Sequence, residues 1–120
     1  MFAKAREMEA ALKAAGKPFV PLIKRTTDET HHIVAHGAEK AKGARDILAK
    51  FGIDIDNPAN GVYLPATKNS PNPNGSIVHS VLHTDKYYEK VELLLDNAKT
   101  QKDAIQTLQK IQRMLENGTF

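Results

Sequence analysis

The pattern of apolar and polar positions predicts helices at both ends of the chain. Residues 3–15 are dominated by Ala, Met, Glu, Leu and Lys, and the Gly and Pro that follow predict the end of a helix there. The next apolar segment, 19–23, is interrupted by Pro21 and is expected to be an edge strand or an extended packing segment. At the other end, residues 100–116 predict a last helix, because apolar side chains recur at helical spacing: Ile105, Leu108, Ile111 and Leu115.

Two short segments in the middle of the chain, the first of which contains β-branched residues, predict two strands. The first segment is 31–36 and the second is 61–65. Between them, residues 38–51 place their apolar side chains on one face, which predicts a helix inserted between the strands. Segments 53–60 and 66–76 are rich in Asp, Asn, Pro, Gly and Ser and are expected to be loops.

From Ile77 onward the chain is expected to be helical up to a break near Asn97. A core-facing stripe is expected from Val78, Val81, Tyr88, Val91, Leu94 and Leu95. Thr84, followed by Asp85, can mark an N-cap or a restart of the helix inside this segment. The order of elements therefore predicts an α+β fold: a small, mostly helical domain with two short strands.

The composition limits the size of the fold and excludes several kinds of functional site. A chain of 120 residues with 41% hydrophobic residues is expected to form a single domain, 1–120, with a modest core. The absence of cysteine excludes disulfides, cysteine-based zinc ribbons and thiol catalysis. A net charge of +3 weakly favours an anionic partner. No apolar run approaches transmembrane length, so membrane insertion is not expected. The first residues carry charges throughout and lack the central apolar stretch of a signal peptide, so none is expected.

The five histidines fall into two groups. His31, His32 and His36 lie within six residues, and His79 and His83 are four positions apart. Residues i and i+4 share one face of a helix, so the second group can present two imidazoles to one divalent ion. Taken alone, such a pair also fits two solvated histidines on an exposed face.

Adjacent histidines place a condition on the first group. Neighbouring side chains on a regular strand point to opposite faces, so His31 and His32 share a site only where the strand ends or bulges. The alternatives are one working histidine, or a histidine that caps the core beside an exposed one. We interpret His32 as the chemically active member, and His36 as a surface residue or a support for the site.

Three segments in this order resemble the AHH family of nucleases, in the HNH/endonuclease VII superfamily, which occurs as C-terminal toxin domains of bacterial polymorphic toxins. The segments are His31-His32-Ile33-Val34, Asn60-Gly61-Val62-Tyr63-Leu64-Pro65 and His79-x-x-x-His83-x-x-x-Tyr87. The likeness covers about residues 29–95, including the expected helix 38–51 and Phe51-Gly52-Ile53-Asp54. The chain departs from the family's Ala-His-His at Thr30, a side chain small enough to be tolerated.

The resemblance implies a ββα-metal finger and a role for each of its polar residues. His32 would be the general base that takes a proton from the attacking water, and a neutral imidazole with an ordinary pKa of about 6.5 suits that task. His79 and His83 would hold one divalent metal ion. His31 would be a further ligand, as the first histidine of the pair is in the nuclease colicins that this site resembles. Asn60 would pin the connecting loop and orient the base.

A bound ion would relieve the negative charge that develops during phosphodiester cleavage. Zinc, nickel, manganese and magnesium are the candidates, and histidine ligation favours the first three over magnesium. Lys68, Lys86 and Arg45 are candidates for contacts with the phosphate backbone, although each alone also fits a solvated side chain.

The function that the resemblance implies is a metal-dependent DNA endonuclease. It would be a secreted toxin effector domain that acts in the cytoplasm of a target bacterium and is neutralised by a cognate immunity protein. Two alternatives stay open: an RNase toxin on the same scaffold, and a non-catalytic nucleic-acid-binding domain in which the histidines bind zinc. A structural zinc site is closed by four protein ligands, whereas a catalytic site keeps one position open.

Overall fold

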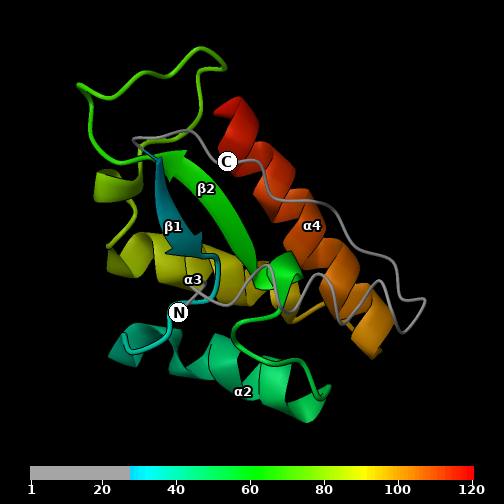
Figure 1. Cartoon of the computed structure of the whole chain (residues 1–120). Coiled ribbons are helices and arrows are strands. Elements are labelled where there is room, and N and C mark those ends of the chain that lie inside the picture. Colours follow the sequence, from blue (N-terminus) through cyan, green and yellow to red (C-terminus); the bar gives the residue numbers. More distant parts are fainter. Residues whose placement is uncertain (1–27) are drawn as a thin grey trace.

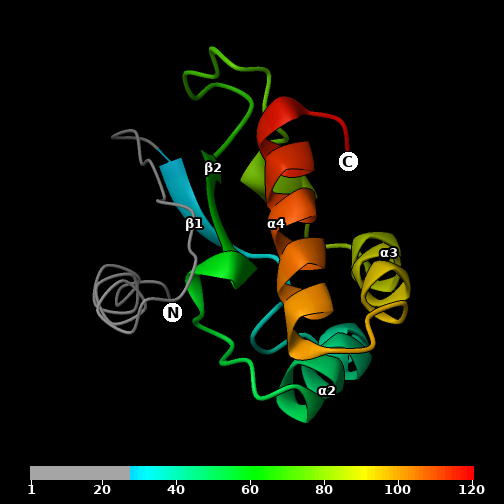
Figure 2. The same cartoon turned by 90° about the vertical axis from the view of Figure 1, so that its right-hand side faces the viewer.

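The described part of the chain, residues 28–120 of a computed structural model, contains a two-stranded antiparallel sheet with three α-helices on one side of it (Figures 1 and 2). The elements are β1 (Asp28–His32), α2 (Lys42–Lys50), β2 (Gly61–Pro65), α3 (Asp85–Leu95) and α4 (Gln101–Asn117). Single 3-10 turns occupy Glu39–Ala41, Pro58–Asn60 and His79–Val81. The α+β prediction is confirmed, with α2 between the two strands. The helix expected at 3–15 and the segment 19–23 lie outside the described residues.

The first strand differs from the prediction, whereas the second has the predicted bounds. β1 ends at His32, opposite Gly61 of β2, so the expectation of a strand over 31–36 is wrong. Ile33 and Val34 are 0% and 1% exposed, and their β-branched side chains fill the core instead of extending the strand. The histidine pair therefore lies at the end of a strand, where the backbone leaves the sheet.

Asn60 holds the backbone that follows β1. Its side chain accepts a hydrogen bond from the N–H of Val34 (2.8 Å) and donates to the carbonyl of the same residue (3.2 Å). It also donates to the carbonyl of Ile55 (2.8 Å), in the segment that precedes β2. Asn60 is completely buried, so it ties two distant segments together inside the core.

Asn60→Ala is expected to lower the free energy of unfolding by about 3 kcal/mol or more. The substitution removes three hydrogen bonds and leaves buried backbone groups of Val34 without this partner. Asn57→Ala is the matched control, because Asn57 caps a 3-10 turn through one bond to the N–H of Ala59 and its loss costs about 1 kcal/mol. Urea unfolding of both variants measures the difference, and equal losses would contradict this role of Asn60.

The segment before α3 is not the continuous helix expected from Ile77 onward. Only His79–Val81 form a 3-10 turn, and α3 starts at Asp85. Thr84 is extended, and its hydroxyl caps α3 by accepting a hydrogen bond from the N–H of Tyr87 (3.2 Å). Val81 is 48% exposed and takes no part in the expected apolar stripe. The expected restart at Thr84 is the arrangement that forms.

The last helix supports the strand pair. α4 follows the expected break near Asn97 and packs against β2 and the turn that precedes it (Figure 1). Gln112 of α4 is buried and donates a hydrogen bond to the carbonyl of Gly61, the residue opposite His32. The core that α4 shares with β2 and α3 is built from large, nearly inaccessible side chains: Leu64, Leu95, Leu108, Ile111 and Leu115. Among the helices within residues 28–120, none has the length and apolar character needed to cross a membrane.

Candidate active site

All five histidines line a single cleft of about 370 Å³. Its walls come from the end of β1, the backbone that follows it and the turn before α3. The lining residues are Thr30, His31, His32, Ala35, His36, Gly37, Ala38, His79, His83 and Tyr88. Two groups that are about fifty residues apart in the sequence therefore meet in space.

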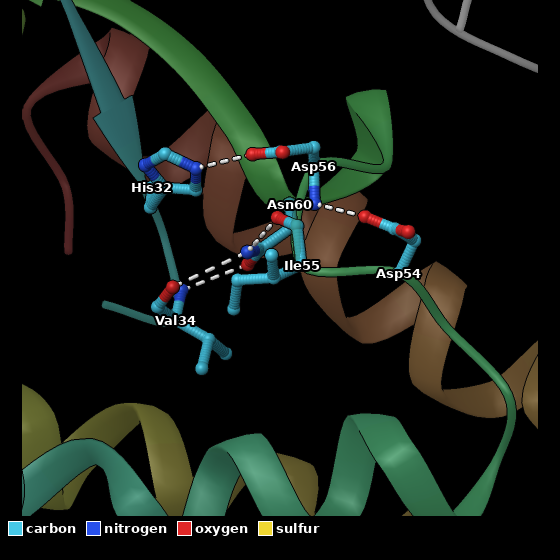
Figure 3. Close-up of polar contacts among 6 residues, drawn as sticks. All are labelled: His32, Val34, Asp54, Ile55, Asp56 and Asn60. Carbon is cyan, nitrogen blue, oxygen red and sulfur yellow. Dashed lines mark hydrogen bonds and ion pairs between the residues drawn. The ribbon is translucent and has the colours of Figure 1, made fainter. Parts of the chain in front are cut away.

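His31 and His32 point to opposite sides, as neighbouring residues on a strand do. His31 is 3% exposed and contacts His79 and Tyr87. His32 is half-buried and contacts Asp56 in the segment before β2 (Figure 3). Because β1 ends here, both side chains still line the same cleft. Of the arrangements considered from the sequence, this is the one in which two histidines share a site at the end of a strand.

Three imidazole rings form a cluster on the side of His31. The Nδ1 atoms of His31 and His79 are 3.1 Å apart, and the Nε2 atoms of His79 and His83 are 3.2 Å apart. The expected proximity of His79 and His83 is present, but its expected cause is not, because neither residue belongs to an α-helix. A 3-10 turn followed by the extended cap of α3 brings them together.

Tyr87 fixes the proton on the buried ring of His31. Its hydroxyl donates to the carbonyl of Ile33 (2.9 Å) and lies 2.8 Å from Nε2 of His31. Because the single hydroxyl proton is used on Ile33, Nε2 of His31 must be the donor in that contact. The lone pair of His31 is then on Nδ1, the atom that faces His79. Tyr87 is part of the motif that carries the family resemblance, yet the sequence did not reveal this role.

Tyr87→Phe is expected to cost about 1–3 kcal/mol of stability and to weaken metal binding about 10- to 100-fold. The change removes the hydrogen bond that holds the His31 ring and leaves the buried carbonyl of Ile33 without this donor. Tyr63→Phe removes a hydroxyl from β2 outside the cleft lining and serves as the control. Urea unfolding and calorimetric metal titration report the two effects, and wild-type values in both would refute the role of this hydroxyl.

Burial favours the uncharged form of two rings of the cluster, His31 and His79. Burial, together with the nearby His79 and His83, lowers the pKa of His31 to about 3. Burial and the proximity of His83 also lower the pKa of His79. Neutral imidazole is the form that binds metal ions, so the lowered pKa values of these two rings favour uptake of an ion.

The chemistry of the cluster fits a divalent ion, but the rings do not yet converge on one point. Within residues 28–120, no group of three or more His, Cys, Asp or Glu side chains is arranged to hold an ion. His79 contacts His31 through Nδ1 and His83 through Nε2, which lie on different edges of its ring. One ion shared by all three therefore requires an imidazole to turn. His83 is exposed and His79 only half-buried, so this turn does not disturb the core.

Asp56 is a site residue that the sequence analysis did not single out. Its Oδ1 lies 2.8 Å from Nε2 of His32 (Figure 3). Burial lowers the pKa of His32, and the hydrogen bond and charge of Asp56 act in the opposite direction. The only sequence signal was an acidic loop between the strands, and the 24 residues that separate the partners hid their contact.

The other residues that the sequence singled out for the site differ in how they lie relative to the cleft. His36 is exposed in the cleft, with its ring centre 6.0 Å from that of His32. Arg45 uses Nη1 to bond the carbonyls of Ala35 and Ala38 (3.0 and 2.6 Å), so it holds the backbone after the histidine pair. The exposed Lys68 and Lys86 are not among the described residues that line the cleft. Phosphate contacts by these three cations stay a prediction.

A family model matches residues 20–117, and its description is a nuclease family of the HNH/ENDO VII superfamily with a conserved Ala-His-His motif. The match includes the last helix, which the sequence analysis had placed outside the likeness. The chain has Thr30 where the motif has alanine, and this residue pairs with Tyr63 of β2 and lines the cleft beside His31. Neither the search of curated proteins nor that of solved structures found a match.

Proposed function

Because the chain belongs to the AHH nuclease family of the HNH/ENDO VII superfamily, we propose that it is a metal-dependent endonuclease that hydrolyses phosphodiester bonds of DNA. One observation carries the proposal: His32 and the His31–His79–His83 cluster open into the same cleft. Hydrolysis of a phosphodiester needs a base for the water and charge relief for the phosphate. The cleft offers residues suited to both tasks.

His32 supplies the base in this mechanism. Its imidazole accepts a proton from a water molecule that attacks the phosphorus atom, while the bond from phosphorus to the leaving ester oxygen breaks and that oxygen takes up a proton from solvent. His31, His79 and His83 would hold the divalent ion that nucleases of this superfamily usually use. When bound, the ion supplies Lewis-acid stabilisation of the negative charge that develops on the phosphate. Asn60 and Arg45 both hold the backbone that follows the histidine pair, Asn60 at Val34 and Arg45 at Ala35 and Ala38, so they support the wall of the cleft that carries His31 and His32.

Plasmid cleavage with purified protein tests the proposal. Supercoiled plasmid and a structured RNA of similar length are incubated with zinc, nickel, manganese or magnesium, each with and without an excess of chelator. Nicking and linearisation of the plasmid that stop with chelator are expected. Cleavage of RNA alone assigns the chain to the RNase reading of the same site. Metal binding without cleavage of either substrate would support a non-catalytic zinc-binding domain and refute the proposal.

We further propose that the nuclease is a secreted toxin effector neutralised by a cognate immunity protein in the target bacterium. The resemblance to toxin domains supports this. A nuclease that cuts DNA without sequence specificity would also damage the DNA of the cell that makes it, so that cell needs a neutralising protein. Induced expression in the bacterial cytoplasm should stop growth and degrade the chromosome, whereas His32→Ala should not. Normal growth with active nuclease present would refute the toxin role.

A further inference from the structure

We propose that Asp56 is the positioning residue for His32, which it holds with the proton on Nε2 so that Nδ1 receives the proton of the attacking water. Oδ1 of Asp56 lies 2.8 Å from Nε2 of His32. An ionised carboxylate only accepts hydrogen bonds, so Nε2 must donate, and the lone pair of the neutral ring is on Nδ1. Nδ1 lies on the side of the ring away from Asp56 (Figure 3). The inference rests on the proposed nuclease function.

Asp56 is itself held in place by its neighbours. Its backbone N–H donates to Oδ1 of Asp54 (2.8 Å), and the carbonyl of Ile55 accepts a hydrogen bond from Asn60 (2.8 Å). The same Asn60 side chain bonds both backbone groups of Val34, two residues after His32. Figure 3 shows two sets of bonds, one joining His32, Asp56 and Asp54 and the other joining Val34, Asn60 and Ile55. Because Ile55 and Asp56 are consecutive residues, the buried amide of Asn60 helps to set the position of the carboxylate relative to the ring.

The two adjacent histidines have different partners, and each partner suits a different task. His31 donates to the neutral hydroxyl of Tyr87, which orients a ring without adding charge. His32 donates to a carboxylate, which also stabilises the cationic imidazolium that forms after a base has taken up a proton. A ligand keeps its charge state through the reaction, whereas a base does not. The charged partner therefore belongs to the residue that changes charge.

Asp56→Ala and the nearly isosteric Asp56→Asn test the proposal, with Asp46→Ala as the control. Asp46 is an exposed carboxylate on α2 whose ion pair with Lys42 contributes little. In Asp56→Ala, kcat is expected to fall about 10- to 100-fold while KM and metal affinity stay within a factor of about three. Asp56→Asn keeps the shape of the side chain but loses its charge and is expected to reduce kcat as well. Asp56→Glu, which restores the carboxylate, is expected to recover part of it.

The tautomer of His32 is a second readout that needs neither metal nor activity. Long-range ¹H–¹⁵N NMR of the metal-free protein is expected to show the Nε2–H form of His32 in the wild type and a mixture of tautomers in Asp56→Ala. A wild-type tautomer and wild-type kcat in Asp56→Ala would overturn the proposal. So would a loss of metal affinity that accounts for the loss of kcat. A wild type that cleaves no nucleic acid refutes the nuclease function, and the tautomer then still decides whether Asp56 orients the ring.

Discussion

His32→Ala is expected to reduce plasmid cleavage by at least about 100-fold while the protein stays folded and binds metal normally. General-base catalysis contributes about 10²–10⁴-fold, and that contribution is lost with the ring. The side chain of His32 is half-buried at the surface of the cleft and belongs to no apolar cluster, so the core is retained. Single-turnover cleavage, metal titration and thermal unfolding of the same preparation measure the three properties.

His31→Ala is the control that separates the two adjacent positions. His31 is buried beside His79 and Tyr87, so its loss should weaken metal binding and stability together with cleavage. The assignment of His32 is wrong if His32→Ala cuts plasmid at a near wild-type rate with metal bound. An exchange of phenotypes between the two variants would show that the roles of the two histidines are reversed.

The sequence predicted the elements whose signals are local. The strand 61–65 was predicted with the bounds that β2 has, because a short apolar run between two loops has few other solutions. The last helix was predicted within one residue at each end, because its apolar spacing is regular and Gly118, with φ of 72°, ends it in a left-handed turn. Such patterns depend on neighbours along the chain, which a single sequence displays.

Elements decided by contacts across the fold were predicted less well. Ile33 and Val34 have the composition of a strand, yet β1 ends at His32. The side chain of Asn60 bonds both backbone groups of Val34, and the carbonyl of Ile33 accepts a hydrogen bond from the hydroxyl of Tyr87. In the segment after Ile77, an apolar stripe that begins at Val78 predicted a helix, whereas the cap at Thr84 starts α3 later. The five histidines were recognised, but the partners that orient them were not. Asp56 and Tyr87 lie 24 and 56 residues from the rings they contact, and no local pattern encodes such distances.

Loss of both His79 and His83 is expected to abolish tight metal binding and the thermal stabilisation that metal provides. A ligand that binds only the native state stabilises it by about 2.7 kcal/mol at a concentration of 100 times Kd. Adding metal should therefore raise the melting temperature of the wild type and leave that of the double alanine variant unchanged. His36→Ala is the matched control, because His36 lines the same cleft but lies near His32, outside the cluster of three rings.

The metal-free double variant should keep nearly wild-type stability, because His83 is exposed and His79 is only half-buried. This separates a loss of ligands from a loss of fold. Titration of the wild type with metal should also change the orientation of the His79 ring. This ring contacts His31 through one nitrogen and His83 through the other, so one ion can be bound by all three rings only after the ring of His79 turns. Side-chain NMR signals of His79 should therefore shift with metal more than those of His36. Wild-type calorimetric affinity in the double variant would show that the ion binds elsewhere and would leave His31 without a role as ligand.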